Sequence, residues 1–455
     1  MEVKNDIWAA QQFERVKMPD KRLYRRLQLL ASRMVEDPSS SIPRQHKAWK
    51  DIKGAYRFYD SERIKFSDII QPHVELTKKM VSAKKVILAI QDTTFISFAN
   101  HPSVNGLTDT GGPSRREKGI VLHTALAVDP SQQHPEVIGI LDQQIIHRSK
   151  LQDKNETYAQ RMSRWRESKK WEEASQRIGL PQGNTKIVEV MDREADVFDV
   201  MLNCQRLEHD FIIRAFHNRM LENVEATKLF DFVKTFPPSG VVEVEVAKKP
   251  GQKPRKAILD VSFSEIKIEG PKKRNNEIFT CNVIYVVERN PPTNQEALEW
   301  LLLTSLEAIS FEDACKIITW YKYRWLIEEY HKCIKTGCNV EKKQFKESLR
   351  IENFLGIANV IAVRLLQLKG FARNSPNRPA KEIIEPLKLR ILLKYTGTED
   401  KDITVKEYYH LVAKIGGFIG RRSDGNPGWQ TLWKGEVKLS LMVEGAKMVI
   451  GEKCG

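Results

Sequence analysis

The chain has 455 residues, a hydrophobic content of 41% and a formal net charge of +15. Its length exceeds the roughly 100–200 residues of a usual domain, so we expect several structural units, and its apolar content excludes a disordered chain. The excess of Lys and Arg favours a polyanionic partner, and nucleic acid is the commonest polyanion.

Cysteine usage and hydropathy limit the cellular compartments in which the protein is expected. The six cysteines form neither a CxxC pair nor a zinc-site spacing, so we expect reduced thiols. The opening "MEVKNDIWAAQQFERV" lacks the apolar core of a signal peptide. No segment approaches the roughly 20 uninterrupted apolar residues that span a membrane. These features predict a cytosolic or nuclear protein without a membrane partner.

Residues 1–72 are predicted to form a small, basic helical unit. In "DKRLYRRLQLLASRMVED", Asp20 is placed as an N-cap, and leucines follow at helical spacing with arginines between them. The arginines are either a solvated face or a DNA contact.

A mixed α/β sheet is predicted next, because the apolar periodicity changes after residue 84. Three strands that pair antiparallel are followed by two strand–helix–strand crossovers. The first expected strand is built on the apolar run 86–90 and ends in polar residues at Asp92. The other expected strands are 119–128, 136–148, 185–192 and 210–216, and the expected helices are 155–179 and 197–207.

The remaining chain contains a β-rich insertion and then more helices. Residues 218–298 alternate in strand style and are joined by the basic loops "KKPGQKPRK" and "GPKKRNN". A short strand at 299–305, a helix through 320–337, a buried helix at 353–370 and a helical tail at 404–455 complete the prediction.

Two acidic residues are placed where open α/β sheets carry reactive groups. Asp92 is expected to end the first buried strand and Asp192 the fourth. Side chains at the carboxyl ends of strands leave the core and can meet a substrate. The plainer interpretation is that each Asp terminates its strand or caps the next helix.

The stretch "WYKYRWLIEEYHKCIKTG", residues 320–337, is expected to be one helix with two faces. At about 100° per residue, Tyr321, Arg324, Glu328 and Lys335 share one narrow sector, opposite an apolar stripe that would dock on the core. Pairing of charges four residues apart explains Arg324 and Glu328. It does not explain Tyr321 or Lys335.

Asp92, Asp192 and Glu328 together suggest a two-metal site for phosphoryl transfer. Mg²⁺ prefers oxygen ligands and takes a few carboxylates together with substrate phosphates. Two ions about 4 Å apart can activate the attacking oxygen and stabilise the leaving one. Arg324 and Lys335 would hold DNA phosphates nearby, which three carboxylates would otherwise repel.

At these residues the chain resembles the bacterial DDE transposases of cut-and-paste insertion sequences. The resemblance is to the group with the Y-(2)-R-(3)-E-(6)-K signature, of the transposon-five type. "QDTT" at 91–94 and "DREAD" at 192–196 are similar to the first two catalytic motifs, and "YKYRWLIEEYHKCIKTG" to the third. "AYRF", "EWLLLTS", "AVRLLQL" and "GGF…GW…LW" also resemble family segments, so the resemblance covers nearly the whole chain.

The resemblance implies a ribonuclease-H-like, retroviral-integrase-like core with a β-rich insertion at about 218–298. A helical domain that binds transposon ends would occupy 1–72, the catalytic domain 73–371, and a helical dimerisation domain 372–455. The active form would be a homodimer on paired double-stranded DNA ends, bacterial and nucleoid-associated. Asp92, Asp192 and Glu328 would bind two Mg²⁺ or Mn²⁺ ions for end hydrolysis, hairpin formation, hairpin hydrolysis and attack of the 3′-OH on target DNA.

Further residues take roles through the same resemblance. Trp300 and Trp325 match positions that receive or brace a base displaced at the hairpin, although Trp300 also suits a core aromatic. Arg214 and Lys332 are expected DNA contacts that could equally be solvated. The last matches, in the end-binding segment, are Arg22 and Arg26.

Four nearby residues carry no assigned role. Glu194 and Asp196 suit a supporting or capping position, and His123 suits a packed strand histidine. His331 lies near the active face, where no further general base is needed.

Two alternative functions remain at this stage. One is a metal-dependent nuclease of the same fold that cuts DNA without strand transfer. The other is a catalytically silent DNA-binding derivative. The Tyr-Arg-Lys set and the two tryptophans disfavour the first, and the presence of all three carboxylates disfavours the second.

Overall fold

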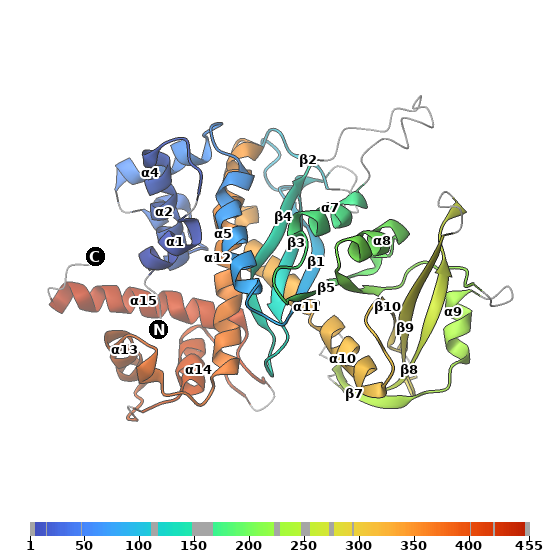
Figure 1. The fold of residues 1–455 in the computed structure, drawn as a ribbon. Helices are drawn as coiled ribbons and strands as arrows, with labels where there is room; N and C mark the ends of the chain where they lie inside the picture. Colours follow the sequence, from blue (N-terminus) through green and yellow to red (C-terminus); the bar gives the residue numbers. More distant parts are fainter. Residues whose placement is uncertain are drawn as a thin grey trace.

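The computed structural model describes residues 5–14, 16–46, 48–110, 117–147, 167–222, 228–246, 255–272, 277–293, 295–400, 402–421 and 424–450. It is a mixed α/β structure in which helical units at both ends of the chain lie beside one large mixed sheet (Figure 1). No helix in these ranges is long and apolar enough to cross a membrane. All five cysteines in these ranges are free thiols.

Short helices form the N-terminal unit, as the sequence predicted. The carboxylate of Asp20 caps α2 by accepting hydrogen bonds from the backbone N–H groups of Arg22 and Leu23. The apolar stripe of α2, which includes Leu27, Leu30 and Met34, is buried. The helices are α1 (Asn5–Phe13), α2 (Lys21–Glu36), α3 (Ile42–Gln45) and α4 (Trp49–Tyr59).

The first half of the sheet has the predicted pairing. The order is β4-β3-β1-β5-β6, with β1–β3 and β3–β4 antiparallel and β1–β5 and β5–β6 parallel. A two-residue strand, β2 (Thr108–Asp109), also pairs with β3. The strands are β1 (Val86–Ser97), β3 (Lys118–Asp129), β4 (Glu136–Ile146), β5 (Lys186–Met191) and β6 (Asp210–Arg214).

The predicted β-rich insertion extends this same sheet. Strand β10 (Glu299–Thr304) pairs antiparallel with β6 on one side and with β9 on the other. The insertion strands then continue as an antiparallel meander beyond β9. They are β7 (Gly240–Val246), β8 (Arg255–Glu269) and β9 (Ile278–Glu288), preceded by α9 (Leu229–Phe232) and the 3₁₀ turn η2 (Val233–Thr235). Most of the two predicted basic loops lies outside the described residues.

Helices cover both faces of the sheet. On one face α5 (Phe66–Val81) and the long helix α12 (Ser348–Asn374) lie side by side against β4 (Figure 1). On the other face lie α7 (Lys169–Ile178) and α8 (Phe198–Arg206). The helix expected over 155–179 is observed only as α7, because residues 155–166 lie outside the described residues. The expected boundaries at 72/73 and 371/372 fall inside α5 and α12.

The C-terminal unit is helical and has its own apolar cluster. Its helices are α13 (Pro386–Thr396), α14 (Val405–Ile415) and α15 (Trp429–Ile450), preceded by the 3₁₀ turn η6 (Ala380–Glu382). Helices α14 and α15 cross at two glycines. A Cβ at Gly416 would lie 1.8 Å from the carbonyl oxygen of Thr431, and a Cβ at Gly435 would lie 1.8 Å from that of Val412.

The segment expected to be one helix through 320–337 is divided. Helix α10 (Phe311–Lys322) ends before α11 (Trp325–Lys332) begins, and a π-helical turn, η4 (Cys333–Gly337), follows. Across the junction the N–H groups of Tyr323, Arg324 and Leu326 bond to carbonyls three residues back. These short-range bonds tighten the chain, so a single helical wheel does not apply from Tyr321 to Glu328.

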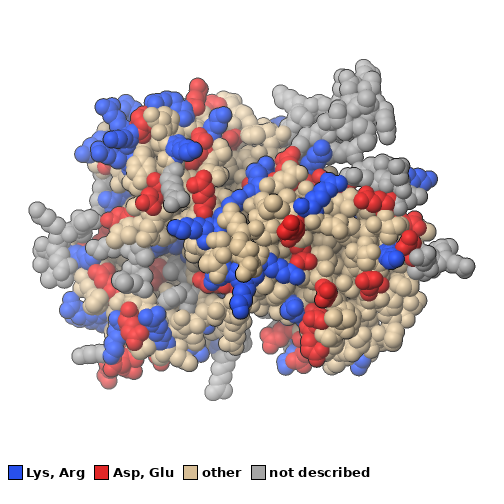
Figure 2. All heavy atoms as spheres, viewed as in Figure 1, with Lys and Arg blue, Asp and Glu red and all other residues tan. Residues whose placement is uncertain are grey.

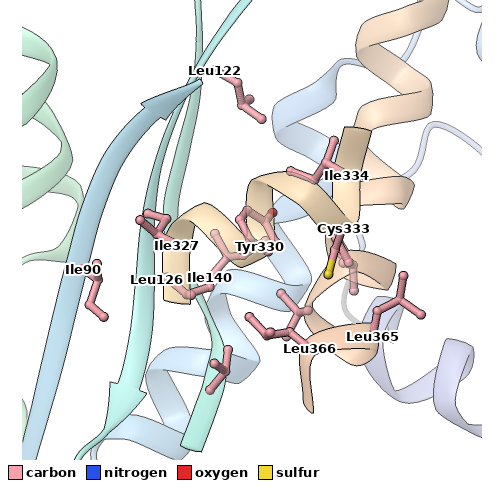
Figure 3. Close-up of a cluster of buried hydrophobic side chains, with 14 of the residues drawn as sticks. Ile90, Leu122, Leu126, Ile140, Ile327, Tyr330, Cys333, Ile334, Leu365 and Leu366 are labelled. Atoms are coloured by element: carbon pink, nitrogen blue, oxygen red, sulfur yellow. The ribbon is translucent and has the colours of Figure 1, made fainter. Parts of the chain in front are cut away.

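The apolar stripe of this segment docks as predicted. Ile327, Tyr330 and Ile334 are fully buried. Figure 3 shows them between the sheet residues Ile90, Leu126 and Ile140 and the α12 residues Leu365 and Leu366. This packing fixes α11 against β1, the strand that carries Asp92. A 3₁₀ turn, η5 (Val340–Lys342), connects this segment to α12.

Candidate active site

The site forms where β1 and β5 stop pairing. Their parallel register ends with Ile90 opposite Val190. Asp92 and Asp192 each lie two residues beyond that last pair, so the register places them at the same level. Asp192 directly follows β5, as predicted, and caps the 3₁₀ turn η1 (Arg193–Ala195). Its carboxylate accepts a hydrogen bond of 2.9 Å from the N–H of Glu194 in that turn.

The prediction that Asp92 ends its strand was wrong. Strand β1 runs on to Ser97 because its other edge stays paired with β3, with Asp92 opposite Thr124. The neighbouring strand β5 ends at this level, so at Asp92 the edge of β1 that faced β5 is no longer paired with it. A strand's last residue depends on both neighbours, and the sequence of β1 shows neither.

Arg324 lies between two of the predicted carboxylates. Its Nη1 is 3.5 Å from Asp92 Oδ2, and its Nη2 is 2.5 Å from Glu328 Oε1. The junction between α10 and α11 places Arg324 at the start of α11, one helical turn before Glu328. Asp92, Arg324 and Glu328 therefore meet although 232 residues separate the first two.

The electrostatics of this group favour a bound cation. Burial, together with the charges of Asp192 and Glu328, raises the pKa of Asp92 to about 7, although the Thr93 N–H and the charge of Arg324 lower it. Burial also raises the pKa of Asp192. Desolvated carboxylates that repel one another are stabilised by added positive charge. Oxygen donors of this kind are the ligands that Mg²⁺ and Mn²⁺ prefer.

The carboxylates do not form a closed metal cage in this arrangement. Among the described residues, no group of three or more His, Cys, Asp or Glu side chains is placed to hold a metal ion. Glu328 reaches Asp92 through the guanidinium of Arg324. The donor types and the register fit a divalent cation, and Arg324 supplies the positive charge between Asp92 and Glu328.

Tyr321 is buried, which corrects its predicted place on an exposed face. Its exposed fraction is 7%, and it belongs to the main hydrophobic cluster. Burial raises the pKa of its hydroxyl, and the charges of Arg324 and Arg214 lower it, so the hydroxyl lies near both guanidinium groups. Arg214 ends β6 and donates a hydrogen bond of 3.0 Å to the carbonyl of Glu299.

Two lysines of the third motif lie at different places. Lys335, in the π-helical turn, has its Nζ 4.0 Å from Glu341, which accepts a hydrogen bond from the N–H of Ser97 at the end of β1. The ammonium of Lys332 lies 4.5 Å from the ring centre of Trp325. Trp325 is 52% exposed, so these two side chains form an outward-facing cation–π pair.

The remaining predicted contacts also differ in setting. Trp300 on β10 is partly buried and packs against the main apolar cluster, which fits a core aromatic. Arg22 is exposed on α2, whereas Arg26 is partly buried and bonds Asp51 at 3.0 Å. Figure 2 shows Lys and Arg gathered over the N-terminal helices.

Residues left without a role have clear contacts. The carboxylate of Asp196 is fully buried and accepts hydrogen bonds from the N–H groups of Phe216 and His217, which holds the turn after β6. Glu194 pairs with Lys170 at 3.1 Å. His331 is buried rather than facing outward, and burial lowers its pKa to about 3.

Sequence reasoning missed a buried polar group behind the site. Glu189, in the middle of β5, is fully buried, and its Oε1 lies 2.6 Å from His209 Nδ1. The available signal was a carboxylate inside the apolar strand "KIVEVM". Buried charges are paired, so that Glu required a partner elsewhere.

Two known protein families match this sequence, one at each end of the chain. The family described as Transposase DNA-binding matches residues 5–64, which contain α1–α4. The family described as Transposase Tn5 dimerisation domain matches residues 360–452, which begin within α12.

One similar solved structure is the cryo-EM structure of a piggyBac transposase synaptic complex with hairpin DNA. It is 9% identical in sequence, covers 94% of this chain and 73% of its own, and has a TM-score of 0.35. At that TM-score the likeness carries no weight. The two family matches, one at each end of the chain, are both to transposase domains and support a Tn5-type transposase.

Proposed function

We propose that this transposase cuts and joins DNA with Asp92, Asp192 and Glu328. The supporting observation is the level register of Asp92 and Asp192 at the free edge of β1, with Arg324 joining Asp92 to Glu328. Bound Mg²⁺ or Mn²⁺ ions, two per site, would activate the attacking oxygen and stabilise the leaving one. The three carboxylates would hold these ions, and Arg324 would offer its guanidinium to a DNA phosphate.

The surrounding residues would orient the DNA. Tyr321 and Arg214 lie beside Arg324, and the guanidinium of Arg214 extends the cationic surface toward β10. Lys335 stands at the end of β1, and Lys332 with Trp325 faces outward, where a flat indole can stack on a displaced base. We assign Trp300 a bracing role only, because it packs in the core. Hairpin formation, hydrolysis of the hairpin to regenerate the 3′-OH, and attack of that 3′-OH on a phosphodiester of the target DNA complete the proposed reaction.

We also propose a division of labour along the chain. The order β4-β3-β1-β5-β6, with β3 antiparallel to β1, suits a ribonuclease-H-like catalytic core that β7–β9 extend. Residues 1–72 would bind the terminal repeats, 73–371 would catalyse, and 372–455 would join two copies in a synaptic homodimer. The proposed site of action is the bacterial nucleoid.

Cleavage of a DNA duplex tests this function directly. The substrate carries the inverted repeat that flanks the coding sequence of the protein, and a denaturing gel resolves nicked and hairpin products in Mg²⁺. Glu328→Gln should lose several kcal/mol of transition-state stabilisation, roughly a thousandfold in rate, while it still binds the duplex.

Glu329→Gln is the matched control, since Glu329 pairs with Lys369 of α12 at 2.6 Å and not with Arg324. It should cleave within a few-fold of wild type. Cleavage by Glu328→Gln at the wild-type rate would refute the assignment. A linear nicked product without a hairpin would support a nuclease, and tight binding without cleavage would support a silent DNA-binding derivative.

A further inference from the structure

A chain of buried hydrogen bonds runs behind β1, on the face covered by α7. It starts at the carboxylate of Glu189, whose Oε2 accepts from Gln91 Nε2 at 2.5 Å and from Ser175 Oγ at 2.7 Å. Glu189, Gln91 and Ser175 are all fully buried. Three elements, β5, β1 and α7, therefore meet at one desolvated carboxylate.

His209 neutralises this carboxylate. Its Nδ1 faces Glu189 Oε1 at 2.6 Å, and its Nε2 faces the carbonyl oxygen of Gly179 at 2.9 Å. Both partners only accept hydrogen bonds, so both ring nitrogens must carry protons and the ring is an imidazolium. The starting point of the chain is thus a fixed, buried ion pair.

The chain continues from Gln91 to the residue beside Asp92. Gln91 donates its amide N–H to Glu189, so its Oε1 is the acceptor for His123 Nε2 at 3.1 Å. Burial lowers the pKa of His123 well below its ordinary value, so the ring is neutral. Its Nδ1 is then an acceptor, and the Thr93 hydroxyl 3.0 Å away is the donor. Every donor between Thr93 and Glu189 points the same way.

The last link reaches the catalytic strand itself. The backbone N–H of Thr93 donates to Asp92 Oδ1 at 2.7 Å. Thr93 and His123 are directly opposite each other on β1 and β3. This pair lies beyond Ile90, where β1 has lost its hydrogen bonds to β5. These side-chain hydrogen bonds hold β1 in place at the level where it no longer pairs with β5.

We propose that Thr93 and His123 are positioning residues that hold the Asp92 carboxylate in the orientation a divalent cation requires. The role rests on the proposed function, since it presumes that Asp92 binds the cation. Ligand orientation of this kind is a common duty of groups behind a metal site, and their loss typically costs about 10–100-fold in metal affinity. The competing explanation is that the chain only satisfies buried polar groups and stabilises the fold.

Thr93→Val tests the proposal because it keeps the shape of the side chain and removes the hydroxyl. Thr93→Ser keeps the hydroxyl and should restore the wild-type behaviour. Thr77→Val is the matched control, since Thr77 is a buried threonine whose hydroxyl bonds the carbonyl of His73 on α5, away from the site. His123→Gln breaks the same link from the opposite strand and serves as a second variant.

Binding of Mn²⁺ is measured by calorimetry on the full chain bound to a pre-cleaved end duplex. That duplex has no scissile phosphate and ends in a 3′-deoxynucleotide, so neither cleavage nor joining contributes. Thr93→Val and His123→Gln should weaken Mn²⁺ binding by about tenfold or more, and Thr93→Ser should remain within about twofold. Thr77→Val should lower the melting temperature and leave Mn²⁺ binding unchanged. The Mg²⁺ concentration that half-saturates cleavage should shift in parallel.

The outcomes separate the positioning role from the function. Wild-type Mn²⁺ affinity in Thr93→Val, or an equal loss in Thr77→Val, overturns the positioning role while Asp92 remains a ligand. Mn²⁺ binding that survives Asp92→Asn at full strength overturns both the role and the proposed function.

Discussion

At the scale of residues, the candidate site depends on partly buried side chains that are distant in the chain and close together in the fold. Spacing and resemblance predicted Asp92, Asp192, Arg324 and Glu328. They could not predict the pairing of Glu189 with His209, because the residues around each of the two do not indicate which side chain it contacts in the fold. Burial of Tyr321 was equally hidden, since it follows from the break between α10 and α11.

The buried His209–Glu189 pair predicts a pH dependence of stability. Burial alone would lower the pKa of His209, but the hydrogen bond and charge of Glu189, the Gly179 carbonyl and the charge of Asp210 raise it overall. A pKa raised in the folded state gives stability that is complete below the unfolded value of about 6.5. That stability is lost as the pH rises through the folded value.

Melting temperatures measured from pH 6 to pH 9 check this expectation. The wild-type protein should lose stability over that range more steeply than His209→Gln, which has no titrating ring at this position. Parallel curves for the two proteins would show that the pair contributes nothing to the dependence.

At the scale of elements, local patterns predicted most strands and helices because alternation and helical periodicity are local properties. The errors came where a partner decides the outcome. Strand β1 continues beyond Asp92 because β3 accompanies it, and the helix at 320–337 divides at a tightened turn. Periodicity indicates which face of a helix is buried. It does not indicate where the backbone hydrogen bonds change from spanning four residues to spanning three.

The crossing of α14 and α15 predicts opposite effects for two glycines of one helix. Gly435→Ala places a methyl group against the Val412 carbonyl and should separate the two helices, with a lower melting temperature and weaker dimerisation. Gly445→Ala meets no atom within 4 Å, so it should stabilise α15 by about 1 kcal/mol through helix propensity. Thermal unfolding and analytical ultracentrifugation measure both. Equal effects of the two substitutions would contradict the close crossing.

At the scale of the whole molecule, the net charge and the basic N-terminal helices predict binding to DNA that depends on salt. Arg22 is exposed and Arg26 is held by Asp51, so the structure separates two residues that the sequence treats alike. Overall composition indicated the polyanionic partner, but it could not show which cations are committed to the fold.

Replacing each arginine with alanine should therefore give different results. Arg22→Ala should weaken end binding and reduce the slope of log affinity against log salt by about 1. Arg26→Ala should chiefly lower the stability of the N-terminal unit, by up to about 1 kcal/mol, because a partly exposed ion pair is lost. Fluorescence anisotropy across a salt series measures the slopes. An unchanged slope for Arg22→Ala would place its guanidinium away from the phosphates.

Helix α12 has a consequence for how two copies cooperate. Its 27 residues form a helix about 40 Å long, which begins beside the segment that carries Glu328 and ends within the part that matches the dimerisation family. Because the helix is unbroken, it fixes the distance between the dimerising part and the proposed active site. Pairing of two copies would therefore set a fixed distance between their two proposed active sites. We expect each insertion to leave a staggered gap of constant width, whatever sequence it enters.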